Sequence, residues 1–182
     1  ALGVGGRMDA VFFLPTFALA TSQITLVGMF IGAGRVDLIR EIVIYTILRA
    51  EIFAIALGVT FWIFAPQLAA WFTDEPKIID IAAQYVRVTS CAFPFITIGI
   101  ISGRVFQGLG SGMPGLLLTS LRIVLFSVPL AWILTQVFDY GLLAVWVSFA
   151  VSGFFTSALA VVWIHLRLRR VEAELLDSGL AV

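Results

Sequence analysis

The chain has 182 residues, of which 61% are hydrophobic and only 12% are charged. Soluble domains are nearer half apolar and a quarter charged, so this chain cannot cover a globule with charge, and a water-soluble enzyme is excluded. Intrinsic disorder is excluded as well, because it requires low hydrophobicity. Eleven Lys and Arg balance eleven Asp and Glu, which leaves no basic footprint for binding a nucleic acid.

The charged residues are spaced so that long stretches of the chain carry none. Six stretches lack Asp, Glu, Lys and Arg: residues 10–34, 52–73, 88–103, 105–121, 123–138 and 140–164. A helix that crosses the hydrocarbon core of a bilayer needs about 20 mostly apolar residues. Lipid offers no partner for backbone N–H and C=O groups, so each crossing is expected to be helical. The pattern therefore predicts an all-α, polytopic transmembrane bundle of about five spanning helices.

In chain order, we predict helices at about 7–33, 44–72, 79–107, 115–138 and 142–167. The linkers between them are rich in Gly and Pro, which interrupt helices, and Pro76 is well placed to start the third helix. The transmembrane bundle then occupies residues 1–167, and residues 168–182 form a C-terminal tail.

Five crossings place the two chain ends on opposite sides of the membrane, and the basic residues are divided unequally between those sides. The side of the N-terminus carries only Arg7, Lys77 and Arg87. The side of the C-terminus carries Arg35, Arg40, Arg49, Arg104, Arg122, Arg167, Arg169 and Arg170. By the positive-inside rule, the C-terminus and its tail face the cytoplasm. We expect a multi-pass protein of the cell membrane, inner or plasma, surrounded by membrane lipid.

Glycine and proline within the spans indicate where helices pack and bend. Gly28 and Gly32, and likewise Gly99 and Gly103, are small-xxx-small pairs that allow close helix approach; the alternatives are static packing and a moving contact. Two prolines lie beside polar residues within their helices, and each marks either a fixed kink or a hinge. These are Pro15 and Pro94.

Three polar residues are candidates for a substrate pathway. Gln23 lies in mid-span, where its amide needs a partner or water, so it lines a cavity or bonds a neighbouring helix. Thr97 lies beside the Pro94 bend. Arg122 is the deepest clear charge, and it either snorkels to the cytoplasmic face or marks a functional site.

The sequence offers few other residues that could bind a ligand or take part in a reaction. Arg49 and Glu51 point to different helix faces and are expected at the membrane interface. The third helix carries no acidic residue between Val88 and Gly103. With one cysteine, Cys91, and one histidine, His165, the chain has no internal disulfide and no His/Cys metal site. No catalytic motif is present, so we expect no enzyme activity, no catalytic residue, no cofactor and no metal.

Three stretches resemble the multidrug and toxic compound extrusion (MATE) family of antiporters. The first runs from Ala18 to Arg35 and reads ALATSQITLVGMFIGAGR, like the end of the eighth helix of the family. The second comprises Phe72–Lys77, residues 82–87 (AAQYVR) and Phe93-Pro94-Phe95, like the approach to the tenth helix and its start. The third, Phe106–Gly110 followed by Pro114 and Leu121-Arg122, resembles the turn into the eleventh helix. The resemblance extends from about Gly3 to Trp163.

This resemblance implies a partial C-terminal lobe, helices eight to twelve of a twelve-helix transporter built from two lobes around a central cavity. It implies secondary active efflux of organic cations or drugs in exchange for Na+ or H+, with the missing N-terminal lobe as a partner. In some branches that lobe holds the coupling carboxylate, and other branches use acids on the seventh and tenth helices. Two alternatives stay open: a lipid-linked oligosaccharide or polysaccharide flippase of the same superfamily, and a non-transporting membrane protein that needs a partner lobe.

Overall fold

The computed structural model describes residues 2–136 and 142–177, and the elements there are all helical. In chain order they are α1 (Leu2–Gly32), α2 (Val36–Ala70), α3 (Pro76–Gly108), α4 (Met113–Ser120), η1 (Leu121–Ser127), α5 (Val128–Gln136) and α6 (Leu142–Asp177). Helices α4, η1 and α5 follow one another without a break. Five helices are long and apolar enough to cross a membrane: Gly5–Gly32, Asp37–Ala70, Pro76–Gly108, Met113–Gln136 and Leu143–Glu174. The predicted all-α bundle of about five spans is confirmed.

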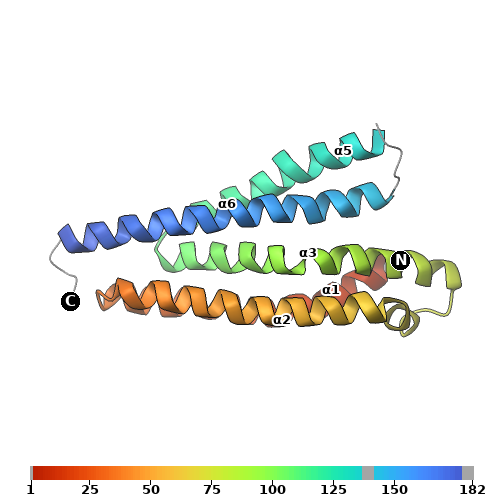
Figure 1. Ribbon diagram of the computed structural model, residues 1–182, viewed down its shortest axis with the longest axis horizontal. Coiled ribbons are helices and arrows are strands. Elements are labelled where there is room, and N and C mark those ends of the chain that lie inside the picture. The colour runs from red at the N-terminus through yellow and green to blue at the C-terminus, as the bar shows by residue number, and fades with distance from the viewer. Residues whose placement is uncertain (1, 137–141, 178–182) are drawn as a thin grey trace.

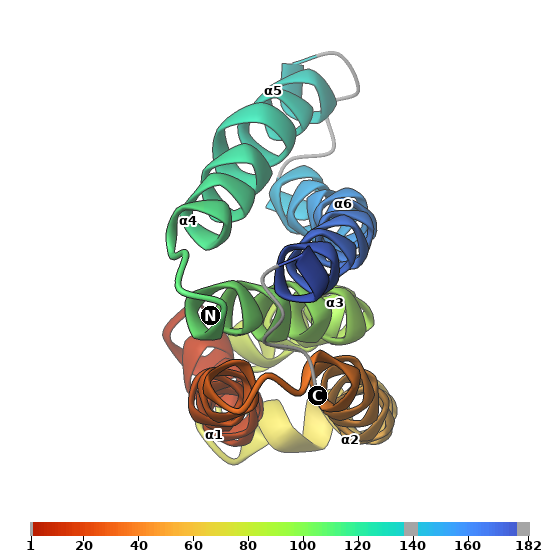
Figure 2. The same cartoon turned by 90° about the vertical axis from the view of Figure 1, so that its left-hand side faces the viewer.

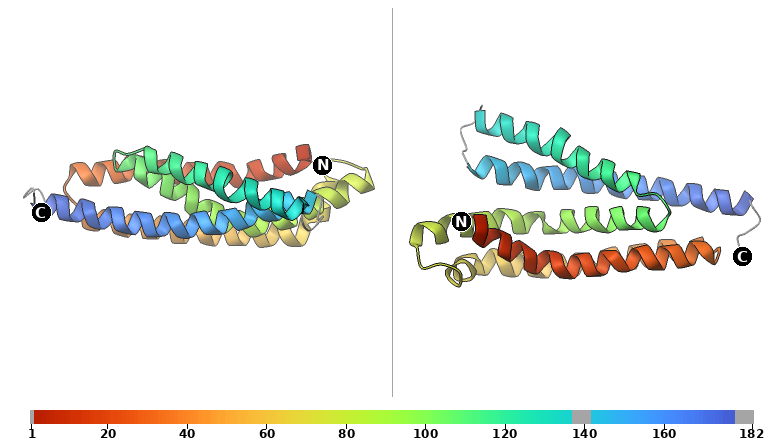
Figure 3. Two further views of the ribbon diagram at one scale, coloured as in Figure 1. Left: turned by 90° about the horizontal axis from the view of Figure 1, so that it is seen from above. Right: turned by 180° about the vertical axis from the view of Figure 1, so that it is seen from behind.

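Helix α3 is the centre of the bundle. Helices α1 and α2 lie on one side of it, and α4 and α6 lie on the other (Figure 2). The long helices run roughly along one axis, whereas α5 diverges from α6 towards its end (Figures 1 and 3). Half of the most apolar window of α3 is buried, against 6% of the corresponding window in Met113–Gln136. Helix α3 therefore contributes most to the interior of the bundle.

Two apolar clusters hold α1, α2 and α3 together. In the first cluster the Phe12 ring stacks on the Phe93 ring, with centroids 3.8 Å apart and planes 4° apart. Its buried members are Met8, Phe12, Ala54, Phe61, Ala65, Ala69, Ala82, Ala83, Val86, Ala92, Phe93 and Ile96. The second cluster, which also reaches α4 and α6, contains Ala20, Val27, Ile39, Val43, Ala50, Ile101, Val105, Phe106, Leu118, Ala160, Ile164 and Leu168. The many alanines allow the helix backbones to approach closely, which favours dispersion contacts where no hydrophobic force acts between lipid and protein.

Helices α2 and α6 extend furthest beyond their predicted bounds. Helix α2 begins at Val36 rather than at residue 44, because Ile39 and Val43 are buried in the second cluster. Helix α6 continues to Asp177 rather than ending at residue 167, and an Arg167–Glu174 ion pair of 3.6 Å joins two of its turns. Part of the predicted tail is thus helical. Its last residues, 178–182, and the predicted helix end at residue 138 lie outside the described residues.

Two glycines in left-handed backbone conformations end α1 and α3. Gly34 has φ 69° and Gly110 has φ 79°. Beyond each glycine the next N–H reaches back into the helix: Arg35 N–H donates to the Phe30 carbonyl at 2.9 Å, and Ser111 N–H to the Phe106 carbonyl at 3.0 Å. This C-cap satisfies carbonyls that the helix leaves free and turns the chain sharply into the next helix.

We expect Gly110→Ala to lower stability by about 1–2 kcal/mol, because a Cβ disfavours the left-handed conformation. A Cβ at Gly110 would meet no atom within 4 Å, so the loss comes from the backbone alone. Gly112 is the matched control: it lies in the same linker, has φ −80° and also has open space around its Cβ position. Thermal unfolding in detergent measures both variants, and equal melting temperatures for G110A and G112A would contradict the cap.

Glycines allow close contacts between α3 and its neighbours, but not all at the predicted positions. Of the predicted pairs, Gly103 approaches Gly115 of α4 closely, and a Cβ at Gly28 would lie 4.0 Å from the Gly108 carbonyl oxygen. Cβ atoms at Gly32 and Gly99, by contrast, would meet nothing within 4 Å. Among the glycines of α3, Gly108 has the tightest contact with α1, and a Cβ there would lie 2.8 Å from Val27 Cβ.

Gly108→Ala is therefore expected to destabilise the bundle by about 1–3 kcal/mol through overpacking. The control is Gly99→Ala on the same helix, which fits without a clash and gains up to about 1 kcal/mol of helix propensity. Chemical or thermal unfolding of the two variants in micelles separates them. A G108A protein as stable as G99A would show that α1 and α3 do not pack in this register.

Candidate functional site

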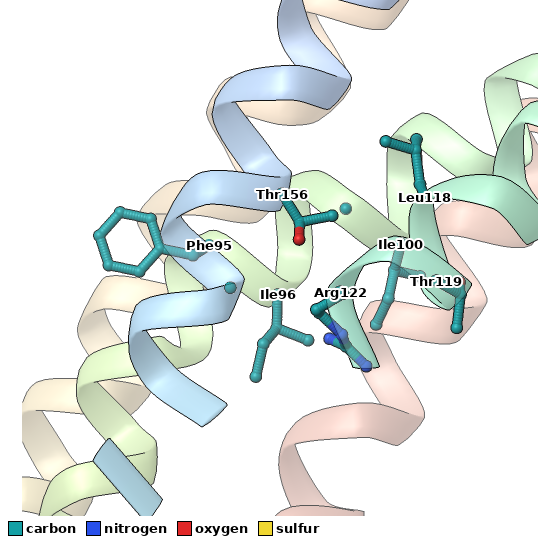
Figure 4. A pocket seen from close by; sticks show the side chains of 9 residues that line it. Phe95, Ile96, Ile100, Leu118, Thr119, Arg122 and Thr156 are labelled. Atoms are coloured by element: carbon teal, nitrogen blue, oxygen red, sulfur yellow. The ribbon is translucent and has the colours of Figure 1, made fainter. Parts of the chain in front are cut away.

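A pocket between α3, α4, η1 and α6 surrounds Arg122 (Figure 4). Its volume is about 80 Å³, which is room for a few water-sized groups. Apolar side chains and backbone form most of the wall, and Thr119 and Thr156 bring hydroxyl groups to it. The lining residues are Phe95, Ile96, Gly99, Ile100, Leu118, Thr119, Arg122, Gly153 and Thr156.

Arg122 reaches this pocket from a π-helical turn. It is the second residue of η1, which separates α4 from α5. Pro129 follows within α5, where its ring would crowd the carbonyl four residues earlier in a regular helix. The wider π turn accommodates such a proline, and π turns occur often at functional sites. By contrast, α1 and α3 continue as helices through Pro15 and Pro94.

The Arg122 guanidinium is held by an aromatic ring rather than by an acid. Its Cζ lies 5.0 Å from the Phe149 ring centroid, and its Nε is buried without a hydrogen-bond partner. Among the carboxylates whose side chains the structure describes, none pairs with it at 4.0 Å or less. The Thr119 and Thr156 hydroxyls donate to carbonyls of their own helices, at 3.0 and 2.8 Å. A positive charge at this depth requires acceptor atoms, so the pocket is suited to water or to a polar group of a ligand.

Gln23, the second predicted pathway residue, lies at the contact of α1 with α2 rather than in the Arg122 pocket. Its Nε2 donates to Thr46 Oγ1 at 2.8 Å, and its side chain is 1% exposed. Its Oε1 is buried and has no partner. This geometry corresponds to the interhelical bond, one of the two alternatives that the sequence leaves open.

Thr97, the third predicted residue, is 1% exposed and lies on α3. Its hydroxyl oxygen is also buried without a partner, and it does not line the Arg122 pocket. The structure thus places Gln23, Thr97 and Arg122 at three separate positions around α3 and does not bring them together.

Two acidic residues that the sequence did not assign to the pathway lie within the bundle. Tyr85 of α3 donates its hydroxyl to Asp9 Oδ2 of α1, and the pair is partly buried. Glu51, expected at the membrane interface, is half-buried and its Oε1 is buried without a partner. Both positions follow from the packing of α1, α2 and α3. The only signal in the sequence was that each acid borders a charge-free stretch.

The fold and its apolar spans define a multi-pass helical membrane protein. The family model described as MatE matches residues 1–133. The chain belongs to the MATE family, a family of transporters rather than enzymes. The resemblance inferred from the three sequence stretches is confirmed.

Individual relatives agree with this family. The chain is 24% identical over 160 residues to a probable multidrug resistance protein NorM of Thermotoga maritima, covering 88% of the chain and 34% of that protein. It is 26% identical over 131 residues to an FAD transporter of Shewanella oneidensis, covering 72% of the chain and 29% of that protein. It also matches an outward-facing structure of a MATE family multidrug resistance transporter, at 22% identity and TM-score 0.89 over 94% of the chain and 38% of that structure's chain. The chain spans about a third of the length of the relatives it matches.

The Gln23–Thr46 bond can be distinguished from a water-filled cavity by Thr46→Val. If the bond joins two helices, removing the acceptor leaves a buried amide unpaired and lowers stability by about 0.6–1.7 kcal/mol, the range for such bonds in membrane helices. Thr21→Val is the control, because the exposed Thr21 hydroxyl bonds only the Phe17 carbonyl of its own helix, at 2.7 Å. Unfolding in micelles is the measurement. No difference between T46V and T21V would show that water replaces the lost bond, as in a cavity.

Proposed function

We propose that the chain is part of a secondary active efflux transporter that exports organic cations and drugs in exchange for Na+ or H+ by alternating access. Membership of the MATE family supports this proposal. The observation that carries it is the Arg122 pocket, an opening inside a mostly apolar bundle that is lined by a charged side chain. Charged residues inside a membrane bundle commonly mark substrate or ion pathways.

The proposal includes an orientation and a partner. The excess of basic residues on the C-terminal side supports a cytoplasmic C-terminus, with residues 168–182 on that face, in the cell membrane. Large apolar side chains on α1, α2 and α4 are exposed in the structure, including Leu14, Ile52 and Leu116. These faces are available for lipid and for an N-terminal lobe that would complete the central cavity.

Within this transporter we assign Arg122 to the substrate pathway. Its guanidinium donates to acceptor atoms of the drug, while Phe95 and Phe149 offer aromatic faces nearby. A cationic centre is repelled by Arg122, so the pocket takes a neutral polar or aromatic part of the drug. Gln23 and Thr97 stay candidates for the same pathway, Pro15 and Pro94 for hinges, and the Gly28–Gly32 and Gly99–Gly103 pairs for contacts that move.

A second candidate follows from the same guanidinium. An unpaired Arg in a pocket with aromatic walls also suits an anionic aromatic molecule, since Arg binds phosphate in a bidentate manner. The relative from Shewanella oneidensis is described as an FAD transporter. Flavin dinucleotide is therefore the second substrate to compare with an organic cation such as ethidium.

The test uses the protein as the cell makes it, reconstituted in liposomes, with ethidium or flavin dinucleotide as the cargo and an imposed Na+ or H+ gradient. Arg122→Gln is expected to reduce transport about tenfold or more, because a hydrogen bond to a charged group contributes about 1.5–3 kcal/mol. Arg170→Gln, an exposed arginine of α6, is the control and keeps full transport.

The two cargoes decide between the candidates. Gradient-driven movement of ethidium supports the cation exporter, and movement of the dinucleotide alone supports the second candidate. If neither cargo moves in the unaltered protein under either gradient, the transporter proposal fails. If both cargoes move equally well in R122Q, Arg122 does not belong to the pathway.

A further inference from the structure

A polar layer separates the two apolar clusters of the bundle. On each of α1, α2 and α3 the buried apolar residues of the two clusters are interrupted by a polar one. On α1 it is Thr16, on α2 Glu51 and on α3 Thr97. The residues that flank this layer are Phe12 and Ala20, Ala54 and Ala50, and Ile96 and Ile101.

The register of α2 against α3 brings Glu51 and Thr97 to the same level. These helices are antiparallel, and a Cβ at Gly58 would lie only 3.0 Å from the Ser90 carbonyl oxygen. Glu51 lies seven residues before Gly58, and Thr97 lies seven residues after Ser90. Seven residues are about two turns of helix. Both residues therefore return to the face where the two helices meet.

Both members of this pair have an oxygen that lacks a hydrogen-bond partner. Glu51 Oε1 and Thr97 Oγ1 are buried and unpaired. The third member of the layer, Thr16, bonds its own helix instead: its hydroxyl donates to the Phe12 carbonyl at 2.9 Å. A buried polar atom is expected to have a hydrogen-bond partner. A proton added to Glu51 would therefore give these two oxygens a hydrogen atom that they could share.

No cation neutralises Glu51. Within the described ranges 2–136 and 142–177, no Lys, Arg or His lies within 4.0 Å of its carboxylate. Several charged groups on the surrounding helices contact other residues. On α1, Asp9 accepts a hydrogen bond from Tyr85, and on α2, Arg49 lies over the Tyr45 ring. On α3, Arg87 donates to the Trp62 carbonyl and Arg104 donates to Gln107. On α6, Arg167 pairs with Glu174, and His165 is exposed.

We propose that Glu51 is a proton-binding site of this protein, and that the Thr97 hydroxyl, which does not bond Glu51 in this packing, becomes its hydrogen-bond partner across the α2–α3 contact when the proton is bound. The inference rests on the proposed transport function and gives it a coupling ion, H+. A lone carboxylate at this depth is costly, so the carboxyl is neutral when the helices are packed as here.

The chemical step is a proton transfer. A carboxylate oxygen of Glu51 accepts a proton from water, an O–H bond forms, and the negative charge is lost. The reverse step returns the proton to water on the other side once the lobe has changed its opening. While the proton is bound, the carboxyl O–H of Glu51 donates to Thr97 Oγ1, and this hydrogen bond joins α2 to α3.

Infrared difference spectroscopy of the whole protein, recorded on a change of pH, tests the site directly. Protonation of a buried carboxyl produces a C=O stretching band of the neutral acid. This band is expected to disappear in Glu51→Gln, to shift in Thr97→Val and to persist in Glu41→Gln, an exposed glutamate on the same helix. An unchanged band in E51Q would overturn the proposal.

Transport in liposomes supplies a second readout, with ethidium as the cargo. E51Q is expected to lose uptake driven by a pH gradient but to keep ethidium counterflow without a gradient, and Glu51→Asp restores a titrating acid and pH-driven uptake. Full pH-driven uptake by E51Q, or coupling to Na+ alone in the unaltered protein, would overturn the proposal. If the unaltered protein moves no cargo at all, the transport function fails, and the infrared band still decides whether Glu51 binds the proton.

Discussion

The structure depends on one constraint: lipid cannot hydrogen-bond a peptide group. Each long apolar stretch must therefore satisfy its N–H and C=O groups within itself, and the helix is the local structure that does so. The same constraint explains the ends of the helices. Where α1 and α3 stop, Gly34 and Gly110 take left-handed conformations, and the N–H groups of Arg35 and Ser111 bond carbonyls that would otherwise be free.

A bundle built in this way can hold polar side chains only where another helix or water meets them. The structure shows three solutions around α3. Gln23 bonds Thr46 across two helices, Arg122 lies over the Phe149 ring in an open pocket, and Glu51 has a buried oxygen with no partner. The first joins two helices through the amide nitrogen, although Gln23 Oε1 is buried without a partner. The other two are ionisable side chains with a buried atom that has no partner, and they leave capacity for a ligand or a proton.

Close packing around α3 positions these groups. Alanines and glycines bring α1 and α2 against α3, so that the Phe12 and Phe93 rings stack and two apolar clusters form on either side of the Glu51 layer. On the other side, the π-helical turn η1 places Arg122 beside α3 and α6. The Arg122 pocket and the Glu51 layer thus share one central helix, and a shift of α3 would reach both.

The sequence by itself determined the number of spans, their helical form and the family, because charge-free length and backbone chemistry are local properties. It also found Gln23, Thr97 and Arg122 as polar residues within apolar stretches. Only the tertiary structure decided which of them meets a partner, that Gly108 rather than Gly99 is tightly packed, and that Glu51 reaches the interior. The physical reason is that contact between helices depends on register and rotation. A difference of one residue turns a side chain by about 100°, and the spacing of charges along one helix does not fix where its neighbours lie.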